Sequence, residues 1–387
     1  MKKFFTALLA TTILFTCTYC AEPKNTYKSG KDKPNSRTYN PEDYVDESNG
    51  YTDFATELFK AYYKSGVDTL CPFTVYRTIA MLSFGAGDAT KQEIIDLLGC
   101  SSEKLNEFSE FFKFQPKEAQ VNFADSVWYN SERQEPYDDF VNSVKQGAEY
   151  KALKFNKSTQ NKINDWVKKN TDGNIKDFIN EPEIEDVRMF IVSTAAVEAK
   201  WRYPYAGSVS GPFCSESGKT TKVKMMTSVE KCFTLPGAKG IKKEYEGNLC
   251  FAAILPDGGL DSFVESLDAE KLKDALKTSS GDITAIIPKF KKESKANLTE
   301  VLKEAGFTLD GDFSRIAPDS GETFVSKAIS AVSIENDEFG TKAFAASEIT
   351  VKESAAMETI TFNRPFLYLV YDTETLMPLF IGAVKEI

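Results

Sequence analysis

The chain has 387 residues, of which 42% are hydrophobic and 12% aromatic, so it can bury a large core and is not disordered as a whole. Its formal net charge of −10 argues against nucleic acid or an anionic membrane as a partner, because both require a concentrated basic face. The sequence contains no histidine, which excludes Ser-His-Asp and Cys-His hydrolytic sites and histidine-ligated zinc, and makes an enzyme a less favoured hypothesis.

The beginning of the chain predicts a secretory signal peptide over 1–21. Two lysines precede an uncharged apolar run that is too short and wrongly flanked for a stable membrane span. We expect cleavage between Cys20 and Glu22; a lipid anchor on Cys17 or Cys20 is less favoured, because the preceding residues fit that motif poorly. The signal carries two lysines and no acid, so the mature chain would have a net charge of −10 − 2 = −12. These features predict a secreted, extracellular protein.

The next segments predict a polar leader followed by helices. Residues 22–50 are rich in Lys, Asn, Ser, Asp and Pro, and we expect them to be disordered. Apolar residues at helical spacing predict a helix over 52–63, with Thr52 or Asp53 as its N-cap. Helical spacing recurs over 79–98, where a glycine-rich break at 84–90 separates two helices and Asp88 or Thr90 caps the second. A further helix is predicted within 160–180, and it stops at the glycine of 171–173.

Strand patterns dominate the second half of the chain. Residues 121–129 alternate between polar and apolar, and 189–199 form a nearly continuous apolar run typical of a central strand buried on both faces. Further strands are predicted at 221–226, 249–255, 283–287, 366–371 and 379–384. Since no linker divides the chain after the leader, we predict a single α+β domain over 51–387.

The cysteines outside the signal peptide do not predict a disulfide scaffold. There are five, an odd and sparse set, so at least one thiol should remain unpaired. Their spacing does not resemble a metal site, and we expect no metal and no cofactor.

Several motifs in collinear order are similar to those of the serpin family. They are "INDWVKKNTDGNI" (163–175), "AKWRYPY" (199–205), "AAILPDGG" (252–259), "IIPKF" (286–290), "SKAISAVSIENDEFGTKA" (326–343), and "ITFNRPFLYLVYD" (360–372) followed by "PLFIGAV" (378–384). Each match alone is weak, but their common order identifies the chain as a member of the serpin family. The resemblance implies the serpin fold, with helices packed on three β-sheets and an exposed reactive-centre loop at about 338–360.

The resemblance also implies a suicide-substrate inhibitor of proteases rather than an enzyme. In this family a target protease attacks the loop and forms an acyl-enzyme. The cleaved loop then inserts as an extra strand into the large sheet and traps the protease. The residues implied as loop hinge and insertion residues are Glu338, Gly340, Thr341, Ala343, Ala345 and Ser347.

The loop has a two-residue period that agrees with insertion. The odd positions from Thr341 to Val351 are small or apolar, as a strand that enters a packed sheet requires. Lys342, Phe344 and Glu348 fall on the opposite phase and can stay at the surface. The family prefers glutamate at the first of these positions and alanine at the second, so we expect slower insertion there. The odd positions favour an inhibitor over a non-inhibitory ligand carrier or chaperone.

The predicted bait bond is Ser354–Ala355, because Ser354 is the seventeenth residue counted from Glu338. A small residue before the cleaved bond suits a shallow specificity pocket, so an elastase-like serine protease is the leading target. The alternatives are bonds after Lys352 (trypsin-like), after Glu353, and after Met357 (chymotrypsin-like), or a cysteine protease as the target.

The region where the family's large sheet opens departs from the family pattern. Cys71 and Thr74 stand where the family has serines, Ser193 where it has asparagine, and Ser330 where it has histidine, whereas Trp201 matches. We expect altered metastability from this smaller polar cluster.

Two sequons, at Asn156 and Asn297, are candidate glycosylation sites if the source is eukaryotic. Residues 101–120 lack a dense cationic face, so a glycosaminoglycan cofactor is not expected, and the protein is expected to be a monomer.

Overall fold

The computed structural model describes residues 45–99, 120–171, 173–180, 184, 187–297, 302–303, 311–320, 329–341 and 358–387. The chain divides into two units, 1–40 and 41–387, and every described element belongs to the second. The predicted signal peptide, most of the predicted leader and residues 342–357 of the predicted loop lie outside the described residues.

Seven α-helices are described. They are α1 (Val45–Lys64), α2 (Pro72–Leu82), α3 (Asp88–Leu98), α5 (Asp138–Lys145), α6 (Lys157–Asn170), α7 (Leu260–Glu265) and α8 (Ala269–Lys277). The expected start of the first helix at Thr52 or Asp53 is wrong, because α1 already begins at Val45 and includes part of the predicted leader. Thr52 is buried inside the helix, where its carbonyl accepts a hydrogen bond from the Thr56 hydroxyl at 2.8 Å.

The expected cap of α3 is also wrong. Its N-cap is Gly87, whose N–H donates to the carbonyl of Asp312 at 2.7 Å and whose missing side chain lets Asp312 approach. Thr90 lies inside the helix, and its hydroxyl accepts from the Asp312 N–H at 2.9 Å. The expected stop of α6 is confirmed, since Gly173 follows it with φ +78°, in the left-handed region that favours glycine.

All the strands predicted from the sequence are confirmed, some within longer elements. The strands are β1 (Thr69–Leu70), β2 (Gln120–Asn130), β3 (Glu149–Leu153), β4 (Met189–Lys200), β5 (Ser208–Cys214), β6 (Thr220–Leu235), β7 (Ala238–Glu244), β8 (Leu249–Pro256), β9 (Gly281–Pro288), β10 (Phe290–Asn297), β11 (Ile329–Asn336), β12 (Gly340–Thr341), β13 (Thr359–Thr361), β14 (Phe366–Asp372) and β15 (Pro378–Val384).

The strands form two continuous hydrogen-bonded sheets, and the nine-stranded one consists of two parts that meet at β6, which together with the six-stranded sheet gives the predicted three-sheet arrangement. The sheet that contains β4 and the start of the predicted loop has six strands in the order β10-β11-β12-β4-β2-β3, and we keep the name large sheet for it. A nine-stranded sheet follows the path β1-β15-β14-β8-β7-β6-β9-β13, with β5 also paired to β6. The long strand β6 is shared by two parts of this path, because its end pairs with β7 whereas its earlier residues pair with β5 and β9.

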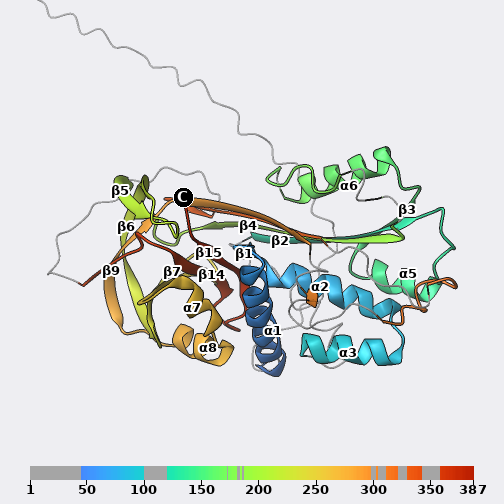
Figure 1. The fold of residues 1–387 in the computed structure, drawn as a ribbon, viewed down its shortest axis with the longest axis horizontal. Helices are drawn as coiled ribbons and strands as arrows, with labels where there is room; N and C mark the ends of the chain where they lie inside the picture. The colour runs from blue at the N-terminus through green and yellow to red at the C-terminus, as the bar shows by residue number, and fades with distance from the viewer. Residues whose placement is uncertain are drawn as a thin grey trace, which may run out of the picture. The chain divides into compact units, whose positions relative to one another are not determined.

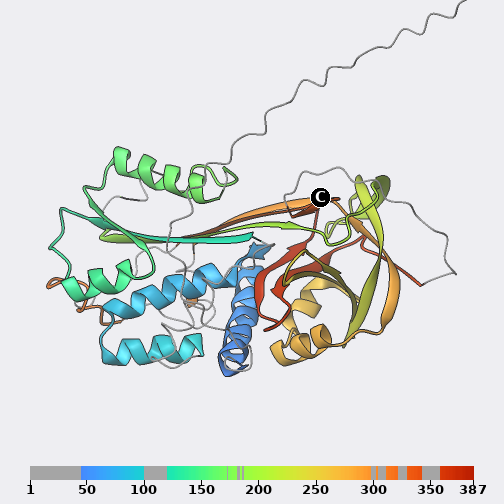
Figure 2. The same cartoon turned by 180° about the vertical axis from the view of Figure 1, so that it is seen from behind.

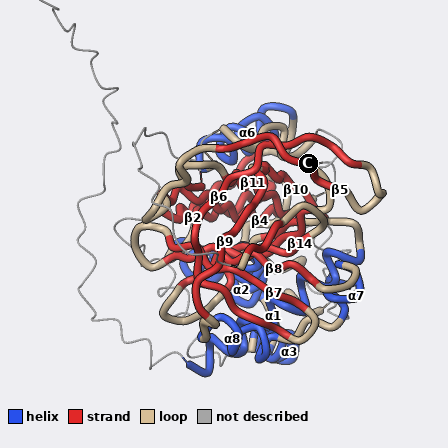
Figure 3. Tube along the Cα trace, turned by 90° about the vertical axis from the view of Figure 1, so that its left-hand side faces the viewer, coloured by secondary structure: helices blue, strands red, loops and turns tan. Residues whose placement is uncertain are grey.

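Helices cover both faces of the large sheet (Figures 1 and 2). Helix α6 lies on one face, and α1, α2 and α3 lie on the other, so the sheet separates the helices when viewed from the end (Figure 3). Strand β4 is buried on both faces, as predicted: Phe190 and Val192 pack with Trp166 of α6, whereas Ala195 and Val197 belong to the main core. The odd-numbered residues of β4 therefore face the main core.

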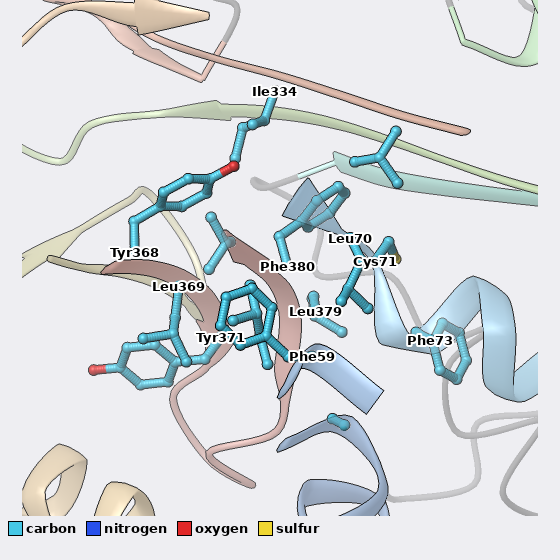
Figure 4. Close-up of a cluster of buried hydrophobic side chains, with 14 of the residues drawn as sticks. Phe59, Leu70, Cys71, Phe73, Ile334, Tyr368, Leu369, Tyr371, Leu379 and Phe380 are labelled. Carbon is cyan, nitrogen blue, oxygen red and sulfur yellow. The ribbon is translucent and has the colours of Figure 1, made fainter. Parts of the chain in front are cut away.

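The main core joins the two sheets. Figure 4 shows Tyr368 of β14 pointing toward Ile334 of β11, with Leu70 and Phe380 close by. All four are almost completely buried. The underside of the large sheet near β11 is therefore packed against the nine-stranded sheet.

Candidate functional site

The start of the predicted loop already occupies a place in the large sheet. Strand β12 lies between β11 and β4 and is antiparallel to both, with Thr341 opposite Asn336 on one side and Ala199 on the other. Thr341 is 2% exposed, and its hydroxyl lies 2.7 Å from the hydroxyl of Tyr245. The first residue predicted to insert is thus held in the sheet before any cleavage.

A tight turn, residues 337–340, connects β11 to β12; we call it the hinge turn. The Asp337 carboxylate accepts from the N–H groups of Phe339 at 2.8 Å and Gly340 at 3.2 Å. Gly340 has φ +152°, and a Cβ at this position would collide with the carbonyl oxygen of Ala199. This position therefore requires glycine.

An aromatic platform, formed by Trp201, Tyr205 and Tyr245, holds the hinge turn. The Trp201 backbone N–H donates to the Phe339 carbonyl at 2.9 Å, and its indole Nε1 donates to the Asp337 carbonyl at 2.9 Å. The rings of Trp201 and Tyr245 are stacked with centroids 4.2 Å apart. The matching tryptophan predicted near the sheet opening is therefore a direct support of the hinge turn.

Glu338, the predicted hinge acid, is anchored by charge. Its carboxylate lies 2.6 Å from Lys289 Nζ, and its carbonyl accepts from the Tyr205 N–H at 2.9 Å. Burial alone would raise the pKa of Glu338, but hydrogen bonds from Lys289 and Ser208 outweigh it and hold the pKa below its ordinary value.

Three of the residues predicted near the sheet opening lie at the contact between α2 and β4. Cys71 is the buried N-cap of α2, and its carbonyl accepts from the Thr74 hydroxyl at 2.9 Å. Burial raises the pKa of the Cys71 thiol to about 12, so it is protonated at neutral pH. The Thr78 hydroxyl donates to both the Thr74 carbonyl at 2.9 Å and the Ser193 hydroxyl at 3.0 Å. Thr78 therefore links the helix to the central strand.

Sequence reasoning missed Thr78 and a buried ion pair beside it. Arg77 of α2 pairs with Asp125 of β2, and its guanidinium carbon lies 5.5 Å from the ring centroid of Phe73. Asp125 is opposite Ser193 in the sheet register. The available signal was the helical spacing, since Thr78 lies one turn after Thr74 on the same face.

A second missed feature is Asn336, which is 1% exposed at the end of β11. Within the described part of the chain, neither its amide nitrogen nor its amide oxygen has a hydrogen-bond partner. An amide buried in this way destabilises the native state.

The remaining predicted residues are placed only in part. Ser330 lies on β11 opposite Ala296. Asn156 is the exposed N-cap of α6, and Asn297 is the last residue of β10. The predicted residues outside the described ranges are Ala343, Ala345, Ser347, Lys352, Glu353, Ser354, Ala355 and Met357.

Within the described ranges, four cysteines are unpaired, namely Cys71, Cys214, Cys232 and Cys250. The same ranges hold no cluster of three or more cysteine or acidic side chains able to bind a metal ion. None of the helices described has the length and apolar character needed to cross a membrane.

The comparisons with known proteins agree on one family. The model of the family described as "Serpin (serine protease inhibitor)" matches residues 49–387. Plasminogen activator inhibitor 1 from Bos taurus is 26% identical over 371 residues, which cover 87% of this chain and 91% of that protein.

Solved structures show the same fold. The thermophilic serpin tengpin in its native state has a TM-score of 0.82 at 28% identity, covering 92% of this chain and 97% of that one. Thyroxine-binding globulin in complex with thyroxine has a TM-score of 0.76 at 23% identity, covering 88% and 98%, and shares the fold alone. The chain, matched by the family model from residue 49 to its last residue, belongs to the serpin family.

Proposed function

We propose that this protein is a secreted inhibitor of a serine endopeptidase that acts as a suicide substrate. The observation that carries the proposal is the position of Thr341, which is seated between β11 and β4 and antiparallel to both. A loop that continues from Thr341 in the same direction would extend β12 down the middle of the large sheet.

If the loop inserted in the register of β12, each of its residues would have defined partners on the two neighbouring strands. Each step of two residues along the loop moves two residues back along β4 and two back along β11. The resulting partners are Val197 and Ile334 for Ala343, Ala195 and Val332 for Ala345, and Ser193 and Ser330 for Ser347.

These partners explain why the small and apolar residues of the loop stand at its odd-numbered positions. Residues directly opposite one another in a sheet share one face, and the odd-numbered residues of β4 face the main core. Val197 and Ile334 are buried there, so the residue that enters between them must be small and uncharged. Alanine at 343 meets that requirement.

The same register gives a reason for a lysine at position 342, where the family prefers glutamate. Extended by one residue in the register of β12, the strand would have Lys342 opposite Glu335 of β11. Opposite charges across neighbouring strands attract, whereas a glutamate at this position would be repelled. This pairing supports the proposal that the lysine is compatible with insertion in this chain.

The chemistry of trapping uses the protease's own serine. The serine oxygen attacks the carbonyl carbon of Ser354, the bond to Ala355 breaks, and the new amino group leaves with a proton. An ester now joins the two proteins. Insertion of about ten residues, at about 1 kcal/mol for each backbone hydrogen bond plus the buried face, releases on the order of 10 kcal/mol. If insertion is faster than hydrolysis of the ester by water, the protease stays bound.

The leading target is an elastase-like protease, because Ser354 has a small side chain. The test is incubation with elastase, chymotrypsin and trypsin, followed by denaturing gel electrophoresis and mass spectrometry of the released C-terminal peptide. We expect a band that survives denaturation with elastase, and a peptide that starts at Ala355.

Complete cleavage by all three proteases without such a band would refute inhibition and favour a non-inhibitory carrier. A peptide that starts at Glu353 would keep the inhibitor but move the bait bond to Lys352 and the target to a trypsin-like protease. Secretion is tested separately by the N-terminus of the mature protein, which we expect between Cys20 and Glu22.

A further inference from the structure

A buried ion pair lies next to the aromatic platform. Lys243 of β7 has a side chain that is 3% exposed, and its Nζ lies 2.6 Å from the Glu230 carboxylate of β6. The same Nζ donates to the Tyr203 carbonyl at 2.9 Å, and the Ser228 hydroxyl donates to the same Glu230 oxygen at 2.6 Å. Charged side chains are rarely buried this deeply unless they are paired, as these are.

The lysine contacts the residues that hold the hinge turn. Its Nζ lies 4.1 Å from the ring centroid of Tyr205 and 5.4 Å from that of Trp201. A cation in this position is attracted to the faces of both rings. The backbone N–H groups of these two residues are the donors to Glu338 and Phe339 in the hinge turn. Lys243 therefore contacts the rings of two residues whose backbone N–H groups hold the hinge turn.

The balance of burial and attraction does not point to a role in stabilising the fold. Burial raises the pKa of Glu230 and lowers the pKa of Lys243, in both cases despite the attraction between them. The loss of hydration on burial thus outweighs the attraction for each partner, and buried pairs of this kind are often replaced by uncharged side chains with no loss of stability. A role in positioning accounts for the pair better than a role in stability.

We propose that Lys243, held by Glu230, is a positioning residue that keeps the hinge turn and Thr341 in place so that the loop can insert without delay. The proposal rests on the proposed inhibitory function. With Thr341 already seated, each new residue extends an existing strand end, whereas a disordered hinge would first have to close a turn between two strands. Slower insertion would give water time to hydrolyse the ester, and more inhibitor would be consumed as substrate.

The test is the double variant Lys243→Met with Glu230→Gln, which removes both charges and keeps similar side-chain volumes. The matched control is Lys231→Met with Asp282→Asn, an exposed pair at 2.6 Å that begins one residue further along β6. Two quantities are measured: the number of inhibitor molecules consumed for each elastase molecule trapped, and hydrogen exchange of the amides at 339–341 in the free protein.

We expect the double variant to keep its native unfolding temperature and its rate of cleavage by elastase. Its consumption of inhibitor per trapped protease should rise by about tenfold, the effect of one lost hydrogen bond to a charged group. Its hinge amides should exchange faster, and the control should match the unmodified protein in both readouts. If the double variant is unstable, Lys243→Arg, which keeps the positive charge and changes only the geometry at the rings of Tyr205 and Trp201, replaces it.

Unchanged exchange at 339–341 would overturn the positioning role, whether or not any protease is trapped. Faster exchange with unchanged inhibitor consumption would show that the hinge turn does not limit insertion and would also overturn the proposal. A failure of the unmodified protein to trap any protease would refute the proposed function. The exchange measurement would still show whether Lys243 holds the hinge turn in place.

Discussion

Replacing Thr341 with arginine tests the insertion mechanism at its first residue. Thr341 is 2% exposed, and its hydroxyl is paired with that of Tyr245 at 2.7 Å. Thr341→Arg would lose this hydrogen bond, worth about 1 kcal/mol, and would bury a charge without a partner, at several kcal/mol. The arginine would therefore leave the seat that Thr341 occupies in the native sheet, and insertion would first have to bury it; a penalty of about 4 kcal/mol slows that step by roughly a thousandfold. Hydrolysis should then precede trapping.

The assay compares Thr341→Arg with Lys342→Arg, a control on the opposite phase that keeps its positive charge. Both variants are mixed with elastase at increasing ratios, and the complex that survives denaturation is quantified. We expect Thr341→Arg to be cleaved as a substrate and Lys342→Arg to trap elastase as the unmodified protein does. Equal trapping by the two variants would refute the assignment of the odd-numbered loop residues to the buried face of the sheet.

Three further changes test separate parts of the account. Asn336→Leu should raise the free energy of unfolding of the native form by about 1–3 kcal/mol, since it removes a buried unpaired amide; a lower unfolding temperature would contradict this. Ser354→Arg should speed complex formation with trypsin by about a hundredfold or more, and no change would place the bait bond elsewhere. Glu338→Gln should reduce the unfolding temperature at pH 6 and should reduce it less at pH 3. The depressed pKa of Glu338 gives stability that is present above its unfolded pKa of about 4.3 and lost as the pH falls through the folded value, so equal effects at both pH values would contradict the role of Lys289.

Sequence patterns predicted the elements with strong periodicity. Strand β4 was predicted as a central strand because its apolar run is nearly continuous, and the structure buries both of its faces. Gly340 was predicted as a hinge from its place in a family motif, and the structure adds the reason, which is the close approach of the Ala199 carbonyl.

The features that sequence reasoning missed depend on tertiary contacts. Lys243 and Glu230 lie in charged stretches that are typical of exposed strands, and only the folded platform shows that both are buried. Thr90 has the side chain of an N-cap, but its hydroxyl is taken by Asp312, which is distant in sequence. The start of α1 was missed because residues 46–49 are polar and carry no helical periodicity.

The most direct test of the central claim is the thermal unfolding of the native protein and of the protein cleaved within residues 342–357. Insertion of the cleaved loop into the large sheet should release on the order of 10 kcal/mol. In a chain of this size that corresponds to an increase of about 12 °C or more in the unfolding temperature of the cleaved form. Equal unfolding temperatures for the two forms would contradict insertion, and with it the proposed inhibitory mechanism.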